Sequence, residues 1–296
     1  PTIVTIGNFD GVHLGHRKLI QRVTTVARTH AARAVVFTFE PHPVQVLFPE
    51  RKLKRLFPRE DQCEQLKALG VDALVIEPFS RQLSQTQPED FLKTYIFEPL
   101  NPRGLIVGYD FSFGANRQGG VAQIEEITHK RNILLEVVPA FETAGGVVSS
   151  TRIRKTIAAG EMRLARELLG RPFYVQGIVE KGNQRGRKLG FPTANLTIQN
   201  ECLPAIGVYA TWTWVRGRRY RSATNVGRNP TFQDDGPVSV ESYILDFDDY
   251  IYGEDVRVEF VERLRAEQKF SSVDELKSQM TKDVDSAKSI LSRDES

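Results

Sequence analysis

The feature that most constrains the fold is a change in periodicity near residue 171. Before it, short apolar runs typical of buried strands alternate with segments of helical periodicity. After Gly170-Arg171-Pro172, short strand-like segments follow one another and are separated by turn residues. A chain of 296 residues is also longer than one ordinary domain. The sequence therefore predicts two domains, residues 1–170 and residues 171–296.

In the first domain, strands interleaved with helices predict a parallel sheet with crossover helices. The expected strands are residues 3–6, 34–39, 73–76, 105–107 and 134–138. The expected helices are residues 17–28, 60–69, 91–97 and 124–131, followed by two short helices within residues 151–169 that break at Gly160.

In the second domain, short strands with turns between them predict a small antiparallel β-barrel. The expected strands are residues 174–180, 207–215, 222–226, 239–245 and 255–264. Ser272 and Glu275 have the spacing of a capping box, which predicts that a C-terminal helix begins there. The apolar face of this helix is expected to comprise Val273, Leu276, Met280, Val284, Ala287 and Leu291.

Composition argues against several classes of function. The net charge is only +3 and the basic residues are scattered, which disfavours a dedicated nucleic-acid surface. No stretch approaches the ~20 apolar residues that a membrane span needs. Cys63 and Cys202 fit no metal-ligand spacing, and the N-terminus carries no pattern of a signal peptide. We therefore expect a cytoplasmic protein, monomeric or weakly homo-oligomeric, whose partners are small molecules rather than nucleic acid or membrane.

A ten-residue string near the N-terminus predicts a phosphate-binding loop. Gly7-Asn8-Phe9-Asp10-Gly11-Val12-His13-Leu14-Gly15-His16 connects the first strand to the first helix, where unpaired N–H groups and the helix dipole favour an anion. Its three glycines would let the backbone approach a phosphate closely. His13 and His16 lie three residues apart, so both imidazoles can face one triphosphate. The same histidines could instead cap the helix or bind zinc, for which only His42 is a plausible third ligand.

A second glycine-rich stretch predicts a nucleotide site in the second domain. Gly182, Gly186 and Gly190 are separated by basic and polar residues that include Arg187, which makes a cationic loop suited to the phosphates of ATP. Neither the Walker pattern nor the dinucleotide fingerprint occurs in the chain, so the site must use another scaffold. On its own, the Thr193-Ala194-Asn195 that follows is an ordinary turn leading into a strand.

Taken together, these strings resemble the prokaryotic bifunctional riboflavin kinase/FAD synthetase family. The nucleotidyltransferase motifs of that family resemble four segments, which are Gly7–His16, Phe39-Glu40-Pro41-His42-Pro43, residues 108–114 with Arg117 and Gly119, and Ser149-Ser150-Thr151-Arg152-Ile153-Arg154. Pro192-Thr193-Ala194-Asn195 resembles the characteristic motif of riboflavin kinases. The resemblance covers essentially the entire chain and implies a Rossmann-like nucleotidyltransferase domain followed by a riboflavin kinase barrel.

The resemblance implies that the first domain transfers AMP from ATP to FMN and releases pyrophosphate. Because FMN phosphate is already an anion at neutral pH, the site needs no strong base and must align like-charged groups and stabilise the leaving group. The expected catalytic donors are His13, His16 and Arg152. The expected nucleotide-binding residues are Gly7, Phe9, Asp10, Gly15, Ser150 and Thr151. Asp110 and His42 are expected on the flavin or ribose side, unless they form only a turn and a rigid loop.

The resemblance implies that the second domain phosphorylates riboflavin with ATP. Thr193 and Asn195 match the family's Mg²⁺ ligands, and oxygen ligands suit that ion. The acceptor hydroxyl must lose a proton, and Glu241 matches the family's base position, although a Glu in a half-exposed strand is usually only solvated. The expected ATP contacts are Gly182, Gly186, Arg187, Gly190 and Thr193, and the expected flavin contacts are Asn225, near Pro230-Thr231-Phe232, and Arg265. Tyr209 and Phe270 could stack on the flavin or pack in the barrel core.

Two other functions stay open at this point. The chain could be a riboflavin kinase whose first domain only senses a nucleotide or a flavin, which the intact His13, His16 and Arg152 argue against. It could also bind RNA, because class I aminoacyl-tRNA synthetases share an H-x-G-H nucleotide element, although the kinase motif of the barrel argues against this. For the leading function the expected small molecules are Mg²⁺, ATP, riboflavin, FMN and FAD.

Overall fold

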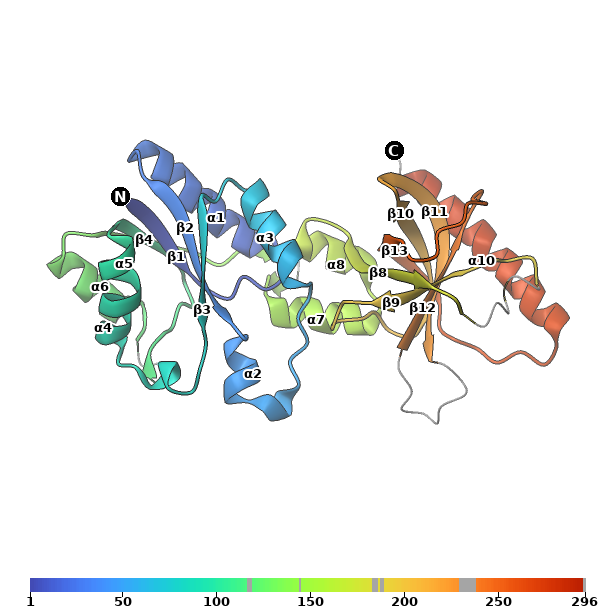
Figure 1. Ribbon diagram of the computed structural model, residues 1–296, viewed down its shortest axis with the longest axis horizontal. Helices are drawn as coiled ribbons and strands as arrows, with labels where there is room; N and C mark the ends of the chain where they lie inside the picture. Colours follow the sequence, from blue (N-terminus) through green and yellow to red (C-terminus); the bar gives the residue numbers. More distant parts are fainter. Residues whose placement is uncertain (116–118, 144, 183–185, 187–188, 229–237, 295–296) are drawn as a thin grey trace. The chain divides into compact units, whose positions relative to one another are not determined.

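The computed structural model describes residues 1–115, 119–143, 145–182, 186, 189–228 and 238–294. The chain divides into two compact units, Pro1–Ser150 and Thr151–Ser296 (Figure 1). Within the described ranges, no helix combines the length and the apolar character that crossing a membrane requires.

The first unit is built on a five-stranded parallel sheet of order β3-β2-β1-β4-β5. Its strands are β1 (Thr2–Ile6), β2 (Arg33–Glu40), β3 (Ala73–Pro78), β4 (Pro102–Gly108) and β5 (Leu134–Val138). Both faces of β1 are buried, because Val4 packs in one apolar cluster and the neighbouring Ile3 packs in another. This burial explains the continuous apolar runs in the sequence, and all five predicted strands are confirmed.

Helices cover both faces of this sheet. One apolar cluster joins the sheet to α1 (Leu14–Thr29) and α3 (Arg59–Ala68). The other joins it to α4 (Pro88–Phe91), the π-helical turn η3 (Leu92–Phe97) and α6 (Val121–Lys130). Shorter elements complete the unit, namely α2 (Pro43–Leu47), η1 (Pro49–Arg51), η2 (Leu83–Gln85), α5 (Glu98–Leu100), β6 (Glu142–Thr143) and β7 (Gly146–Val147).

The order of the strands defines where a ligand can bind. From β1 the chain proceeds outward through β2 and β3, and it then returns to the other side of β1 with β4 and β5. The connections that leave the carboxyl ends of β1 and β4 therefore diverge, which opens a crevice at this edge in parallel sheets of this kind. The two connections are residues 7–13 and residues 109–120, and both contain predicted site residues.

The second unit is a closed six-stranded barrel of order β10-β11-β12-β9-β8-β13. Its strands are β8 (Phe173–Glu180), β9 (Ala194–Ile198), β10 (Gly207–Val215), β11 (Arg218–Arg228), β12 (Val238–Ile244) and β13 (Asp255–Arg265). The predicted antiparallel barrel is confirmed, and it contains one strand more than the five predicted. The additional strand is β9, which pairs with both β8 and β12 and closes the barrel between them.

The C-terminal helix α10 (Val273–Asp294) covers the outside of the barrel over β10, β11 and β13. Ser272 Oγ accepts a hydrogen bond from Glu275 N at 3.1 Å, as the predicted cap requires. The Glu275 carboxylate accepts from Ser271 N at 2.8 Å, one residue before the cap. The hydrogen bond from the Ser271 hydroxyl lowers the pKa of Glu275 most, and the bond from Ser271 N lowers that pKa further.

Two short helices lie between the sheet and the barrel in the sequence, and they pack with the barrel. These helices are α7 (Ser150–Ala159) and α8 (Met162–Leu169), which break at Gly160 as predicted. Arg163 of α8 donates to Glu262 of β13 at 2.9 Å. The division between the compact units therefore falls after Ser150, the first residue of α7, whereas the predicted functional boundary follows both helices near residue 171. That functional boundary stays a prediction.

The packing of α10 yields a prediction about the stability of the barrel. Leu291 is fully buried against β10, so Leu291→Ala should lower the free energy of unfolding of the second unit by about 3 kcal/mol through the cavity it leaves. Val273, on the same helix, is 62% exposed, and Val273→Ala should change that free energy by less than ~0.5 kcal/mol. Both tryptophans of the chain lie in β10, so urea titration followed by their fluorescence reports on this unit. Equal losses in the two variants would contradict this packing.

Candidate functional sites

The loop after β1 is wound tightly by three residues with positive φ. Phe9, Gly11 and Val12 have φ of 49°, 83° and 39°. Such values are uncommon for residues other than glycine, and here the burial of the Phe9 and Val12 side chains holds the turn. Val12 N donates to Phe9 O at 3.1 Å and closes it. The loop therefore has a defined shape before any ligand binds.

His13 and His16 stand together at the start of α1. His13 is the N-cap residue, and its Nδ1 accepts from His16 N at 3.3 Å, so the capping interpretation of His13 is correct. A neutral His13 then carries its proton on Nε2. The two rings are stacked with centroids 3.6 Å apart. A side chain at Gly15 would lie 3.2 Å from His13 Cε1, which explains the glycine between them.

The second imidazole of the pair has an unsatisfied buried nitrogen. His16 Nδ1 is shielded from solvent and has no hydrogen-bond partner among the described residues. Burial lowers the pKa of His16 well below its ordinary value of 6.5, and the nearby His13 lowers that pKa further. His16 is therefore neutral at pH 7. A buried polar atom without a partner is unusual in a folded protein, so this nitrogen marks a candidate position for a ligand contact.

The remainder of the chain fixes the loop through its backbone and through Asp10. The Asp10 carboxylate accepts from Leu56 N at 3.1 Å, and Asp10 O accepts from Ser150 Oγ at 3.0 Å. Asn8 O accepts from Gln62 Nε2 at 2.7 Å. Asp10 is almost fully buried, so its observed contacts are those of an anchor for the loop. Its predicted contact with the nucleotide stays a prediction.

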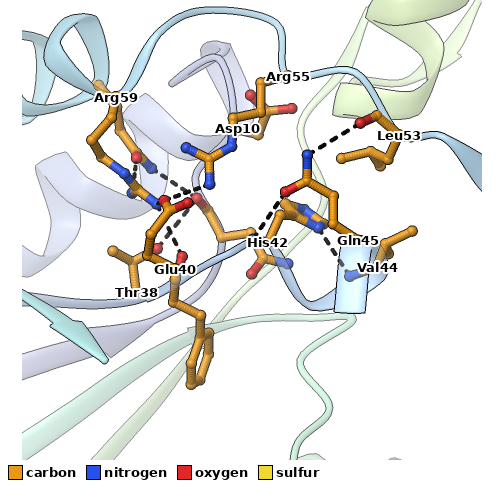
Figure 2. A network of polar contacts seen from close by, with 12 residues as sticks. Asp10, Thr38, Glu40, His42, Val44, Gln45, Leu53, Arg55 and Arg59 are labelled. Carbon is orange, nitrogen blue, oxygen red and sulfur yellow. Dashed lines mark hydrogen bonds and ion pairs between the residues drawn. The ribbon is translucent and has the colours of Figure 1, made fainter. Parts of the chain in front are cut away.

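Next to this loop, two arginines converge on one carboxylate at the end of β2. Arg55 and Arg59 both form ion pairs with Glu40, and Arg59 also donates to Phe39 O at 3.0 Å (Figure 2). Burial alone would raise the pKa of Glu40, but the hydrogen bonds and charges of the two arginines outweigh it and lower that pKa. Glu40 belongs to a segment that the sequence analysis singled out, but Arg55 and Arg59 were not predicted, because no local spacing relates either arginine to Glu40.

His42, which follows Glu40 closely, has a structural role as a helix cap. Its Nδ1 accepts from Val44 N at 3.1 Å, and its own backbone N donates to the side chain of Gln45 at 3.3 Å (Figure 2). The interpretation of this segment as a rigid loop therefore has direct support. A contact between His42 and the flavin stays a prediction.

The remaining predicted residues of the first site differ in how the structure places them. Asp110 is exposed and follows β4, at the carboxyl edge where the crevice is expected. A side chain at Gly7 would lie 3.1 Å from the Phe9 ring, so Gly7 accommodates that ring. Thr151 and Arg152 follow Ser150 in α7 and belong to the second unit. The assignment of Thr151 and Arg152 to the nucleotide stays a prediction. Arg117 lies outside the described residues.

In the barrel, three predicted residues form one row across three neighbouring strands. Glu241 of β12 lies directly opposite Asn195 of β9 on one side and opposite Asn225 of β11 on the other. Residues that face each other in antiparallel strands project from the same face of the sheet. The inner face is taken by the flanking Val240 and Ser242, which are fully buried. The row Asn195–Glu241–Asn225 therefore lies on the outer face of the barrel.

The predicted metal ligands adjoin this row. Thr193 Oγ1 lies 3.5 Å from the Glu241 carboxylate, and Asn195 Nδ2 donates to Thr193 O at 3.4 Å. A side chain at Gly182 would lie 2.3 Å from Asn195 Cγ, so only glycine fits there. The structure thus brings Gly182, Thr193, Asn195 and Glu241 together, as predicted for one site.

Two further glycines shape the segment that leads to Thr193. A side chain at Gly186 would lie 2.3 Å from Phe191 O, and Gly190 has a φ of 91°. Leu189 N and Phe191 N both donate to Gly186 O, at 3.0 and 2.9 Å. Arg187 and residues 230–232, which sequence reasoning singled out, lie outside the described residues.

The residues expected near the flavin have structural partners in the barrel. Arg265 forms an ion pair with Asp283 of α10 at 2.8 Å, and its guanidinium lies 5.7 Å from the centroid of Phe270. Tyr209 is fully buried against Phe260, and burial raises the pKa of Tyr209 to about 12. The core-packing interpretation is therefore correct for Tyr209. Flavin contacts by Arg265 and Asn225 stay predictions.

The lowered pKa of His16 predicts how the first unit responds to acid. Because the unfolded chain binds this proton more readily than the folded one, stability should fall as the pH drops below the ordinary value of 6.5. His16→Gln should show a shallower fall over the same range. The measurement is thermal unfolding by circular dichroism at several pH values, with tryptophan fluorescence identifying the transition of the barrel. Identical pH slopes in the two proteins would show that His16 does not carry this effect.

Both halves of the chain match models of known families. Residues 1–152 match the model described as FAD synthetase, and residues 169–291 match the model described as riboflavin kinase. A solved structure from Streptococcus pneumoniae, described as a macrolide-efflux protein, is similar over 97% of this chain and 93% of its own. Its TM-score is 0.89 and its sequence identity is 34%.

Curated relatives share the whole two-part arrangement. The bifunctional riboflavin kinase/FMN adenylyltransferase of Listeria monocytogenes is 37% identical over 95% of this chain and 90% of its own length. The proteins of the same name from Bacillus subtilis and Escherichia coli K12 are 34% and 33% identical, each over 95% of this chain and 90% of their own. The chain therefore belongs to the bifunctional riboflavin kinase/FMN adenylyltransferase family, whose enzymes convert riboflavin to FMN and FMN to FAD.

Proposed function

We propose that each activity has its own ATP site, one at the loop after β1 and one at the outer row of the barrel. The observation that carries the first assignment is the stacked histidine pair with its unpartnered buried nitrogen. The observation that carries the second is the alignment of Asn195, Glu241 and Asn225 beside Thr193. Neither site is of the Walker type, and each presents ATP to a different acceptor.

At the first site, the phosphate of FMN attacks the α-phosphorus of ATP and pyrophosphate leaves. The N-terminal turn of α1 offers backbone N–H groups and a positive dipole end to the triphosphate. Burial keeps His16 neutral, and His16 and His13 donate hydrogen bonds to phosphate oxygens as charge moves onto the leaving group. Thr151, Arg152 and the backbone N–H of Ser150 supply further donors from the start of α7, while the Ser150 hydroxyl already donates to Asp10 O.

At the second site, Glu241 accepts the proton of the ribityl hydroxyl as that oxygen attacks the γ-phosphorus of ATP. Glu241 is half-buried in a strand, which fixes the carboxylate more firmly than a loop would. Thr193 lies within 3.5 Å of it, so the acceptor and the phosphate are held close together. Gly182 lies against Asn195, and its backbone would lie next to the phosphates.

The same residues fit a magnesium ion. Thr193 and Asn195 offer a hydroxyl and an amide oxygen, and the absence of a side chain at Gly182 lets its backbone lie close to the Asn195 amide. Hard oxygen ligands of this kind suit Mg²⁺, which retains water and phosphate oxygens as its other ligands. The ion would neutralise charge on the phosphates of ATP. Cytoplasmic residence and a monomeric or weakly oligomeric state also stay proposals.

The division between the sites predicts that the two products can be separated by mutation. Replacing His13 and His16 together by Ala should abolish formation of FAD and leave formation of FMN intact, because the barrel does not depend on these residues. The measurement is chromatography of the products from riboflavin, ATP and Mg²⁺. Equal loss of FMN and FAD would contradict the proposed division.

The role of Glu241 predicts the complementary result. Glu241→Gln keeps the shape of the side chain but removes the base, so kcat for riboflavin phosphorylation should fall by roughly 10²–10⁴-fold. Adenylylation of added FMN should stay at the wild-type rate. Tyr243→Phe, on the same face of β12, serves as a matched control and should retain kinase activity. Full kinase activity in Glu241→Gln would exclude this residue as the base.

A further inference from the structure

The interior of the barrel contains a closed ring of five hydroxyl groups. Around the ring, Thr211 is 2.7 Å from Ser222, Ser222 is 2.8 Å from Thr213, and Thr213 is 2.9 Å from Ser242. Ser242 is 3.0 Å from Thr224, and Thr224 returns to Thr211 at 2.7 Å. All five residues are fully buried. Each hydroxyl therefore has two hydroxyl neighbours within hydrogen-bond distance, and the five hydroxyl groups form a closed ring.

The ring includes two of the three strands that carry the row Asn195–Glu241–Asn225, namely β11 and β12. Thr211 and Thr213 belong to β10, Ser222 and Thr224 to β11, and Ser242 to β12. Thr224 and Ser242 lie directly opposite each other on the inner face, and the next pair on the outer face is Asn225 and Glu241. The bond between the Thr224 and Ser242 hydroxyls thus joins β11 to β12 one residue from the row.

If stability were the only requirement, apolar side chains would be a simpler filling for the interior of the barrel than a ring of hydroxyl groups. A buried hydroxyl destabilises the fold unless it is hydrogen-bonded, and apolar side chains of similar volume would fill the space without this condition. The neighbouring inner pair is apolar, since Val226 faces Val240 and both are buried. Hydrogen bonds differ from apolar contacts in being directional, so they fix the spacing and the offset of two strands more narrowly.

We infer that Thr224 and Ser242 are positioning residues for the kinase reaction. Through their hydroxyl bond, anchored by the other three members of the ring, they hold β11 and β12 so that the Glu241 carboxylate stays aligned with Thr193 and Asn225. This inference rests on the proposed role of Glu241 and extends it to the inner face of the barrel. Because all five ring residues are fully buried, the ring acts through the backbone of these two strands rather than by contact with a substrate.

The direct test compares Thr224→Val, which keeps the volume but removes the hydroxyl, with Thr224→Ser, which keeps the hydroxyl. Thr224→Val should lower kcat for riboflavin phosphorylation by ~10-fold or more, because small misalignments at a reacting centre are costly. The KM for riboflavin and ATP should change by less than ~2-fold, and Thr224→Ser should retain at least about half of kcat, since the binding groups and the ring persist. Adenylylation of added FMN by the same proteins is the internal control.

A second comparison separates positioning from general stability. Val240→Ala removes buried volume on the other side of Glu241 in the same strand and leaves the ring intact. It should lower the thermal midpoint of the barrel, followed by tryptophan fluorescence, at least as much as Thr224→Val, while kcat stays within ~2-fold of wild type. If Thr224→Val is unfolded at the assay temperature, Ser242→Ala, which removes one oxygen, takes its place.

The outcomes distinguish this inference from the assignment of the base. Unchanged kcat in Thr224→Val, or an equal loss of kcat in Val240→Ala, would overturn the role of the ring. Loss in Thr224→Val together with full activity in Glu241→Gln would overturn the assignment of Glu241 but would keep a positioning role for the ring beneath the row. Full activity in both variants would overturn both statements.

Discussion

The kinase half of this enzyme depends on the register of its strands. In a sheet, a shift of one residue turns every side chain to the opposite face. Asn195, Glu241 and Asn225 come from three strands, and they meet outside the barrel only because β9, β12 and β11 pair in one register. The same register places Val240 and Ser242 inside. The core and the outer row Asn195–Glu241–Asn225 are thus the two faces of one pairing pattern, so a change of register would move both.

Much of the architecture could be predicted because its signals are local. Buried parallel strands give apolar runs, and all five runs of the first unit became strands. β9 escaped prediction as a strand of its own, because it is short and begins with Ala194 and Asn195, two residue types that are depleted in strands. The helix α2 escaped as well, since its start depends on the imidazole of His42, which is an unusual cap.

The sites show the same division between local and distant signals. The glycine loop, the capping histidine and the glycines near Thr193 follow from short-range spacing, and the structure explains several of those glycines by the groups that occupy their space. The convergence of Arg55 and Arg59 on Glu40 and the hydroxyl ring follow from tertiary packing. They have no sequence signal, because the partners are brought together only by the folded sheet or barrel. The match of both halves to flavin-enzyme families supports the bifunctional enzyme over a kinase with a sensor domain and over an RNA-binding module.

The course of α7 has a consequence for dissecting the enzyme. This helix starts with Ser150, which is bonded to the glycine loop, and continues through residues that pack with the barrel. Cutting the chain where its packing divides would split the motif Ser149–Arg154 between two fragments. A fragment with the complete motif must instead include α7, and it would then display apolar side chains such as Ile153 and Ile157 that the intact chain buries. Low solubility of an isolated adenylyltransferase half would thus reflect where the cut was made rather than a defect in its sheet.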